Sequence, residues 1–499
     1  MPLPLDQLAV LTDAALSTAQ SAGCTSAEFR VERIRGQSVR LRDLALEGAT
    51  DTVEFGLGIR VVIDGAIGFA GTVDVTPEAA AELTGQAINA ARITAAASAQ
   101  RVELAPEPAH GEVSWSSQFE VDPITIPLAD KAALLTAWSE RLLAHPSVTH
   151  TQASILNVSE LTYLADLNGT RAAQHRVRIH PVLEALAAAE DGFETMRTIA
   201  LPAGRGWEFL TATGPAAPFD WEAELTQLPE HLAEKVAAPS AEPGHYDLVI
   251  DPTNLFLTIH ESIGHATELD RAVGYEAAYA GTSFATFDQL NHLQYGSPVM
   301  QITGDRTTPH GLATIGIDSE GVAAQSFDIV KDGVLVGYQL DRAIAATMGF
   351  DRSNGCAFAD SPLHIPIQRM ANVSLGHSGP SGPTTADLIA HVDRGIYIVG
   401  DKSWSIDMQR YNFQFTGQRF FMIEKGCLTG QVKDVAYQAT TTDFWGSLEA
   451  VGGESTYVLG GAFNCGKGQP GQVAPVSHGC PSVLVRNVNV LNTRAEAGR

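Results

Sequence analysis

Long stretches in the first half of the chain alternate apolar with polar residues and meet at residue pairs that suit tight turns. Residues 56–70 form such a stretch around Asp64-Gly65, and two more strand patterns meet at Asn168-Gly169. Asp-Gly and Asn-Gly adopt the positive backbone angles of a two-residue hairpin, and alternation is typical of strands. A further alternating stretch, 26–45, predicts a hairpin with its turn at Arg35-Gly36. These patterns predict an antiparallel sheet.

Three helical patterns accompany the strands. Apolar residues recur at helical spacing from residue 5 to residue 22, and Gly23 is a suitable C-terminal stop. Thr76 and Pro77 suit the N-cap and the first position of an alanine-rich helix that continues to about Ala97. Residues 128–143 predict a third helix. The first half is therefore predicted to be α+β.

A polar stretch with two prolines, residues 237–244, interrupts the pattern and predicts a domain boundary. At 499 residues the chain is longer than one hydrophobic core usually serves. Beyond this stretch strand patterns predominate and helical patterns are few. We therefore predict an α+β fold with an N-terminal α+β domain over 1–236 and a β-rich C-terminal domain over 245–499.

Acidic residues outnumber basic ones 57 to 32, which gives a formal net charge of -25. Nucleic acids and anionic membranes attract proteins through concentrated lysine and arginine, so this balance argues against both as partners. No apolar run reaches the roughly 20 residues that cross a bilayer, and the first residues lack the basic start of a secretory signal. The expected location is cytoplasmic. Five widely spaced cysteines do not resemble a disulfide framework, so reduced thiols are expected.

The segment His260-Glu-Ser-Ile-Gly-His265 holds the main candidates for chemistry. Imidazole nitrogens are common zinc ligands, and a glutamate beside a ligand can act as general base toward a water molecule. The common zinc-peptidase signature places its histidines four residues apart, whereas His260 and His265 are five apart. From spacing alone, capping or core roles for both histidines remain open.

The five-residue spacing carries a geometric prediction. On a regular α-helix it turns the two rings about 140° apart, too far to face one ion. A π-helical turn, whose hydrogen bonds join residues five apart, would bring both rings to one side. The apolar run 255–259 predicts a buried helix before the motif, entered at Asp251, and Gly264 is expected to ease the distortion. We predict a widened or broken helix at 262–265.

The motif has the form HExxxH and is followed by Glu268-Leu-Asp270. Together they resemble the signature of the TldD/PmbA family, whose members are also described as modulators of DNA gyrase. The resemblance is specifically to the zinc metallopeptidase members of that family. Further segments agree in the family's order and span nearly the whole chain: Gly56-Leu-Gly-Ile-Arg60 with Gly68-Phe-Ala70, Asp318-Ser-Glu-Gly-Val322, Gly333-Val-Leu-Val-Gly-Tyr-Gln-Leu-Asp341, His364-Ile-Pro366 with Arg369-Met-Ala-Asn372, and Cys465-Gly-Lys467.

The resemblance implies a zinc peptidase with His260, His265 and Cys465 as metal ligands and Glu261 as general base. Cys465 is preferred over Cys480 because Cys465-Gly-Lys467 matches the family. Zinc would acidify a water molecule, and Glu261 would move its proton to the leaving amine. Members of this kind are associated with cleaving small unfolded or extended peptides together with a catalytically silent TldE/PmbA-like partner, so a heterodimer or a homo-oligomer is expected.

Some residues depart from the family pattern or lie outside it. The segment 401–407 stands where many relatives have a Gly-Gly stretch, which leaves substrate preference open, and the segment Cys356-Ala-Phe-Ala-Asp360 is also unusual. The remaining histidines have no ligand-like spacing; they include His292, His310, His364 and His478. Two other functions compete with a peptidase: a noncatalytic binding or assembly subunit with a structural zinc, and a zinc amidase that acts on small molecules.

Overall fold

One seven-stranded sheet of very long strands forms the frame of the first half. The computed structural model describes residues 2–189, 192–468 and 470–496. The strand order is β3-β2-β1-β5-β6-β4, with β7 also paired to β6, and neighbours are antiparallel except β4 and β6. The strands are β1 (Ser26–Arg42), β2 (Ala45–Ile63), β3 (Ala66–Thr72), β4 (Glu112–Ser116), β5 (His150–Asp166), β6 (Arg171–Ala189) and β7 (Gly192–Arg197).

Two of the three predicted turns are confirmed. Asp64 and Gly65 have φ of 53° and 69° between β2 and β3, and Asn168-Gly169 lies between β5 and β6. The turn predicted at Arg35-Gly36 is wrong, because β1 continues through it. Gly36 is paired on both sides, with Thr52 and with Val158, so the hydrogen bonding of a central strand holds it extended. The chain turns later, at Asp43, where φ is 52°.

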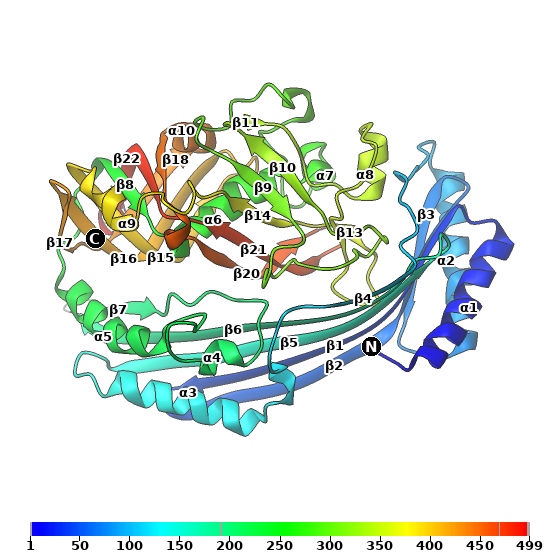
Figure 1. Ribbon diagram of the computed structural model, residues 1–499, viewed down its shortest axis with the longest axis horizontal. Helices are drawn as coiled ribbons and strands as arrows, with labels where there is room; N and C mark the ends of the chain where they lie inside the picture. Colours follow the sequence, from blue (N-terminus) through cyan, green and yellow to red (C-terminus); the bar gives the residue numbers. More distant parts are fainter. Residues whose placement is uncertain (1, 190–191, 469, 497–499) are drawn as a thin grey trace.

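Helices cover one face of this sheet (Figure 1). The apolar odd-numbered residues of β1 pack against α1 and α2 at one end, as Phe29 does, and against α3 and α5 at the other, as Val39 does. The three predicted helices are confirmed as α1, α2 and α3, whereas α5 was not predicted. The helices are α1 (Leu5–Ala22), α2 (Pro77–Ala97), α3 (Leu128–Leu143), α4 (Glu208–Thr211) and α5 (Trp221–Ala237), with a 3₁₀ turn at Pro123–Thr125.

The second half of the chain lies in the hollow of the long sheet, against its other face (Figure 1). Its largest sheet has the order β15-β8-β22-β18-β16-β17, and an additional pairing of β15 with β16 closes five of these strands into a ring. The ring and its branches comprise β8 (Gly244–Ile250), β15 (Arg394–Ile406), β16 (Asn412–Glu424), β17 (Cys427–Gln431), β18 (Val435–Thr440), β19 (Leu448–Val451) and β22 (Val483–Asn492).

Smaller elements surround this ring. A four-stranded sheet and two ribbons are formed by β9 (Ile302–Asp305), β10 (Ser326–Lys331), β11 (Val334–Leu335), β14 (Asn372–Leu375), β12 (Ala357–Phe358), β13 (Ile367–Gln368), β20 (Val458–Lys467) and β21 (Gln472–Cys480). The helices are α6 (Pro252–Ile259), α7 (Leu269–Ala272), α8 (Arg342–Thr347), α9 (Thr385–Ala390), α10 (Thr441–Gly446) and α11 (Thr493–Glu496). The predicted α+β class with a β-rich second half is confirmed.

Buried charges join the two halves. Glu28 of β1 and Arg60 of β2 point toward the second half, and Arg60 forms ion pairs with Glu28 and with Glu320. Arg342 donates from its backbone to Glu320 and from its guanidinium to Glu28.

Among the residues that the structure describes, no helix has the length and apolar character needed to span a membrane.

Candidate metal centre

The helix that carries the motif is deeply buried and changes its winding at His260. Asp251 caps α6 by accepting the Thr253 N–H at 2.9 Å, and every residue of α6 is buried. From His260 to Gly264 the chain forms a π-helical turn, in which the His265 N–H donates to the His260 carbonyl. A short 3₁₀ turn, His265–Thr267, follows. The predicted widening of the helix is confirmed.

Gly264 serves a different purpose from the one expected of it. Its φ of −53° and ψ of −58° are helical angles that any residue adopts, so the wide turn does not need glycine for backbone freedom. A Cβ at this position would instead lie 2.4 Å from Met370 Sδ. Glycine therefore lets Met370 pack directly against the turn.

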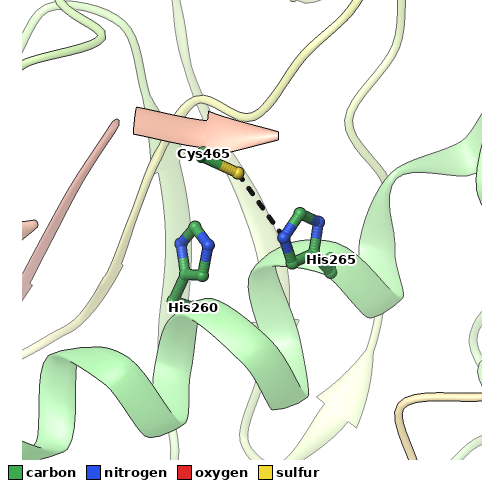
Figure 2. A group of neighbouring side chains, drawn as sticks. All are labelled: His260, His265 and Cys465. Carbon is green, nitrogen blue, oxygen red and sulfur yellow. Dashed lines mark hydrogen bonds between the residues drawn. The ribbon is translucent and has the colours of Figure 1, made fainter. Parts of the chain in front are cut away.

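The wide turn brings His260 and His265 to the same side, where both meet Cys465 of β20 (Figure 2). One potential ligand atom from each residue lies within 4.8 Å of the others, and all three residues are buried. His265 Nε2 is 3.5 Å from Cys465 Sγ. Ligand atoms around a tetrahedral zinc lie about 3.5 Å apart, given Zn–N bonds near 2.0 Å and Zn–S bonds near 2.3 Å. The separation between His265 Nε2 and Cys465 Sγ thus equals that of two ligands on one zinc ion.

A third histidine sets the tautomer of His260. His478 Nδ1 lies 2.8 Å from the Val373 carbonyl, which can only accept, so this nitrogen carries the proton. Burial, followed by repulsion from His260, holds the pKa of His478 well below its usual value, so the ring is neutral. Its Nε2 therefore accepts the proton of His260 Nδ1 at 2.7 Å. His260 Nε2 is left with a free lone pair, as a metal ligand requires.

A buried carboxylate does the same for His265. His265 Nδ1 donates to Glu268 Oε2 at 2.9 Å, which leaves Nε2 unprotonated on the side of Cys465. Burial alone would raise the pKa of Glu268, but the Lys467 ammonium and the His265 ring hold it well below its usual value. Lys467 Nζ lies 3.0 Å from Glu268 Oε1 and 2.8 Å from Asp270 Oδ1. A network of buried charges thus fixes the orientation of the ring.

Cys465 is predisposed to be a thiolate. Burial raises the pKa of a thiol, but attraction to the protonated form of His265 and to Arg369 outweighs burial and lowers the pKa of Cys465. A metal ion bound between the two side chains would take the place of that proton. Arg369 donates to the Cys465 carbonyl and, from its other terminal nitrogen, to the Gln472 carbonyl at 3.1 Å. Two neutral imidazoles and a thiolate are the donor set that zinc prefers, so the residues present fit this metal.

Glu261 lies beside the cluster but is already paired. Its Oε2 accepts a hydrogen bond from Arg410 Nη1 at 2.7 Å. Arg410 is in the loop between β15 and β16, adopts a φ of 63°, and is held there by Thr441, whose hydroxyl donates to the Arg410 carbonyl at 2.7 Å. This loop follows the segment 401–407, so that segment lies in the hairpin that reaches the candidate base.

The other candidates from the sequence lie apart from the cluster or beside it. Cys480 is buried with its Sγ 3.7 Å from the Pro252 carbonyl and is not among the three grouped ligands in the described part of the chain. His364 pairs with Asp360 at 2.7 Å and is partly exposed. His478, which spacing rules rank low, touches His260 directly. The position of His478 beside His260 is evident only from the way β14 and β21 pack next to the motif.

Known proteins agree with this architecture. A sequence profile described as the PmbA/TldA metallopeptidase C-terminal domain matches residues 243–492, about half of the chain. A second profile, PmbA/TldA metallopeptidase domain 1, matches residues 27–91. The chain belongs to the PmbA/TldA metallopeptidase family. The predicted family resemblance is thereby confirmed.

Similarity to relatives of this family extends over almost the whole chain. A metalloprotease of Synechocystis sp. is 27% identical over 469 residues, which is 93% of this chain and 94% of that protein. A solved structure from Thermotoga maritima, provisionally described as a modulator of a DNA gyrase, has a TM-score of 0.76 at 16% identity and covers 97% of this chain and 100% of its own. TldE from Thermococcus kodakarensis has a TM-score of 0.70 at 15% identity, with coverage of 97% and 99%. The two structures share the fold.

Proposed function

We propose that the chain is a zinc-dependent peptidase that hydrolyses small unfolded or extended peptides. In this proposal His260, His265 and Cys465 hold the metal and Glu261 is the general base. The observation that carries it is the convergence of two unprotonated imidazole nitrogens and a thiolate-prone cysteine beside a buried carboxylate. Membership of a metallopeptidase family and distant relatives named metalloproteases support it.

In this proposal the metal, Glu261 and Arg410 have separate roles. When bound, zinc would supply a Lewis acid that polarises the scissile carbonyl and acidifies a nearby water molecule. Glu261 would accept the proton of the attacking water at Oε1, since Oε2 is engaged by Arg410. It would then donate that proton to the leaving amine nitrogen. Arg410 would keep the carboxylate positioned between these two transfers.

Three protein ligands favour a peptidase over a subunit with a structural metal. Closed structural zinc sites use four protein ligands, whereas catalytic sites use three and leave a position open. In the described residues the cluster has three members. We further propose a partner similar to TldE or PmbA, or a second copy of this chain, in a cytoplasmic complex. The shared fold with the solved TldE supports this assembly.

Glu261→Gln tests the catalytic assignment. This variant should bind zinc like the wild type but lose hydrolysis of casein or a mixed peptide pool, because an amide cannot accept the proton. Zinc content is measured by atomic absorption, and hydrolysis with and without 1,10-phenanthroline and with and without the proposed partner. Glu222→Gln, at an exposed ion pair on α5, is the matched control. Undiminished cleavage by the Glu261 variant would refute its role.

The alternative, a noncatalytic subunit, predicts a different result. In that case wild type and variant both bind zinc, and neither cleaves any peptide, with or without the partner. Native mass spectrometry of the chain alone and of the mixture measures the assembly in the same experiment. A wild type that binds zinc and cleaves only in the absence of chelator supports the peptidase.

A further inference from the structure

The residue that holds Glu261 has a strained backbone. Arg410, which donates to Glu261 Oε2 at 2.7 Å, has a φ of 63°. A long side chain is uncommon in this left-handed region, because its Cβ crowds the following carbonyl oxygen. Most other non-glycine residues with positive φ in the described chain are Asp or Asn, which tolerate it better. Such strain persists only where the surroundings impose it, and it concentrates at functional sites.

One carboxylate organises the loop that carries Arg410. Asp407 Oδ1 accepts the backbone N–H groups of Gln409 at 3.1 Å and of Tyr411 at 2.8 Å. Its Oδ2 accepts the backbone N–H of Asn412 at 3.0 Å and the Asn412 side-chain amide at 2.6 Å. Burial raises the pKa of Asp407, but these hydrogen bonds outweigh burial and lower it, so the group stays ionised at neutral pH. The two oxygens thereby fix the backbone on both sides of Arg410.

The carbonyl groups of this loop are bound as well. Each of the four carbonyls from residue 408 to residue 411 accepts a hydrogen bond from another segment of the chain. The donors, in that order, are the N–H groups of Thr282 and Phe284, and then the hydroxyl and the N–H of Thr441, at 2.7–2.9 Å. A loop bonded in this way holds one conformation, which fixes the direction of the Arg410 side chain.

We propose that Asp407 is a positioning residue for peptide hydrolysis and acts through Arg410 on Glu261. The inference rests on the proposed function, in which Glu261 accepts and returns a proton. Asp407 shapes the loop, the loop directs Arg410, and Arg410 engages one oxygen of Glu261. A carboxylate held at one oxygen has its other oxygen fixed in space. Proton transfer to and from the same atom requires this fixed geometry.

Arginine labelling tests the positioning without any need for hydrolysis. The full-length protein with zinc added is treated with phenylglyoxal, which modifies accessible guanidinium groups, and each arginine is followed by peptide mass spectrometry. The Arg410 side chain is paired and 14% exposed, so it should react slowly in the wild type. Asp407→Ala removes four hydrogen bonds and should speed labelling of Arg410 at least fivefold. Arg42, which is 61% exposed, is the reference, and labelling of Arg271, which is 1% exposed, would report unfolding.

Kinetics test whether the positioning serves the reaction. Asp407→Ala should lower kcat for a peptide substrate at least tenfold and change KM less than threefold, because Glu261 acts in the transition state rather than in binding. Asp407→Asn keeps one acceptor oxygen and should recover part of the loss. In an Arg410→Met background, Asp407→Ala should lower kcat less than twofold further. The matched control is Asp387→Asn, at a carboxylate that accepts the Thr384 N–H at the surface, and should change neither constant.

The outcomes separate this proposal from the proposed function. Unchanged labelling of Arg410 in Asp407→Ala overturns the positioning role, and so does a kcat loss that persists in full in the Arg410→Met background. A wild type that cleaves no peptide, with or without the partner, refutes the peptidase and with it the kinetic role, while labelling still decides whether Asp407 places Arg410. If labelling of Arg271 shows that Asp407→Ala does not fold, Asp407→Asn replaces it in both experiments.

Discussion

His478 determines which nitrogen of His260 is available to a metal. The imidazole chain from the Val373 carbonyl through His478 leaves one lone pair on His260, directed toward His265 and Cys465. Without His478, the two tautomers of His260 would compete, and the ring would lose its fixed orientation. His478 is thus expected to affect metal binding strongly through His260, although it does not need to contact the ion.

Replacing His478 should weaken metal binding. His478→Phe keeps a ring of similar size but removes the acceptor, and partners of this kind typically change metal affinity by about 10- to 100-fold. Zinc affinity is measured by competition with a chromogenic chelator. His292→Phe, at an exposed position, is the control and should keep wild-type affinity. Unchanged affinity in the His478 variant would show that the ring only fills space.

Individual site residues differ in how far the sequence reveals them. His260 and His265 can be predicted to meet because the wide turn follows from their spacing along one helix. Cys465 requires the family resemblance, since the chain returns to the motif only 200 residues later. His478 and Arg410 follow no spacing rule, because strand pairing and a loop conformation bring them in. Their roles, and those of the three ligands, remain predictions for experiment.

At the scale of elements, the wide turn is held by what packs against it. Gly264 leaves just enough space for Met370, so a side chain at this position must move either the turn or Met370. Gly264→Ala should destabilise the fold by about 1–3 kcal/mol, the usual cost of overfilling a packed core. Urea unfolding followed by tryptophan fluorescence measures this cost.

A second glycine provides a matched control for this variant. Gly85 lies within α2, and a Cβ there would have nothing within 4 Å. Gly85→Ala should therefore stabilise the protein by about 0.5–1 kcal/mol, because alanine loses less backbone entropy in a helix. If both variants moved stability in the same direction, the packing argument at Gly264 would be wrong.

An ion pair between β5 and β6 should make stability depend on pH in acid. Burial raises the pKa of Glu160, but the charges of Arg176 and Arg178 outweigh burial and lower it from 4.5 to about 2. Because the folded pKa lies below the unfolded one, this contribution is complete above about pH 4.5 and is lost as the pH falls toward 2. A shift of this size corresponds to on the order of 3 kcal/mol at neutral pH.

Glu160→Gln measures that contribution. The variant leaves two buried arginines without their acid and should be less stable by roughly 3–5 kcal/mol at pH 7, with a flatter acid dependence. Urea midpoints at several pH values between 7 and 3 give both quantities. Glu222→Gln, at an exposed pair, should retain the wild-type dependence. A Glu160 variant with the full wild-type slope would assign the acid sensitivity to other carboxylates.

The elements themselves are largely predictable where local signals are strong. Capping by Thr76 defines the start of α2, and Gly23 in the left-handed conformation defines the end of α1. Asp64-Gly65 defines a hairpin. The error at Arg35-Gly36 has a physical cause, because two neighbouring strands hold Gly36 extended. A local pattern cannot report a neighbour such as Val158, which lies more than a hundred residues away.

Across the whole molecule, buried ion pairs connect the two halves. The division into domains 1–236 and 245–499 remains a proposal. The segment between them is held by two hydrogen bonds: Ser240 Oγ donates to Asp434 at 2.6 Å, and the Ala241 N–H donates to the Lys433 carbonyl. Arg60 meets Glu320 across 260 residues of sequence, a pairing that no local pattern reports. The two halves are thus expected to unfold together.

Glu320→Gln tests this coupling. Arg60 and Arg342 would then share only Glu28, and removing one partner of a buried pair typically costs about 3–5 kcal/mol. Differential scanning calorimetry should show a lower transition temperature and a single transition. Glu47→Gln, at the exposed pair with Arg42, should change stability by no more than about 0.5 kcal/mol. Two separate transitions in the wild type would contradict the coupling.

Arg369 and Met370 contact both the metal centre and Arg306. Arg369 holds the strand of Cys465, the Met370 side chain packs on the wide turn, and the Met370 carbonyl accepts from Arg306. Because two consecutive residues make all of these contacts, a shift of this segment would displace the cysteine strand and the turn that carries both histidines at once. The three candidate ligands are therefore expected to keep or lose their mutual alignment as a unit.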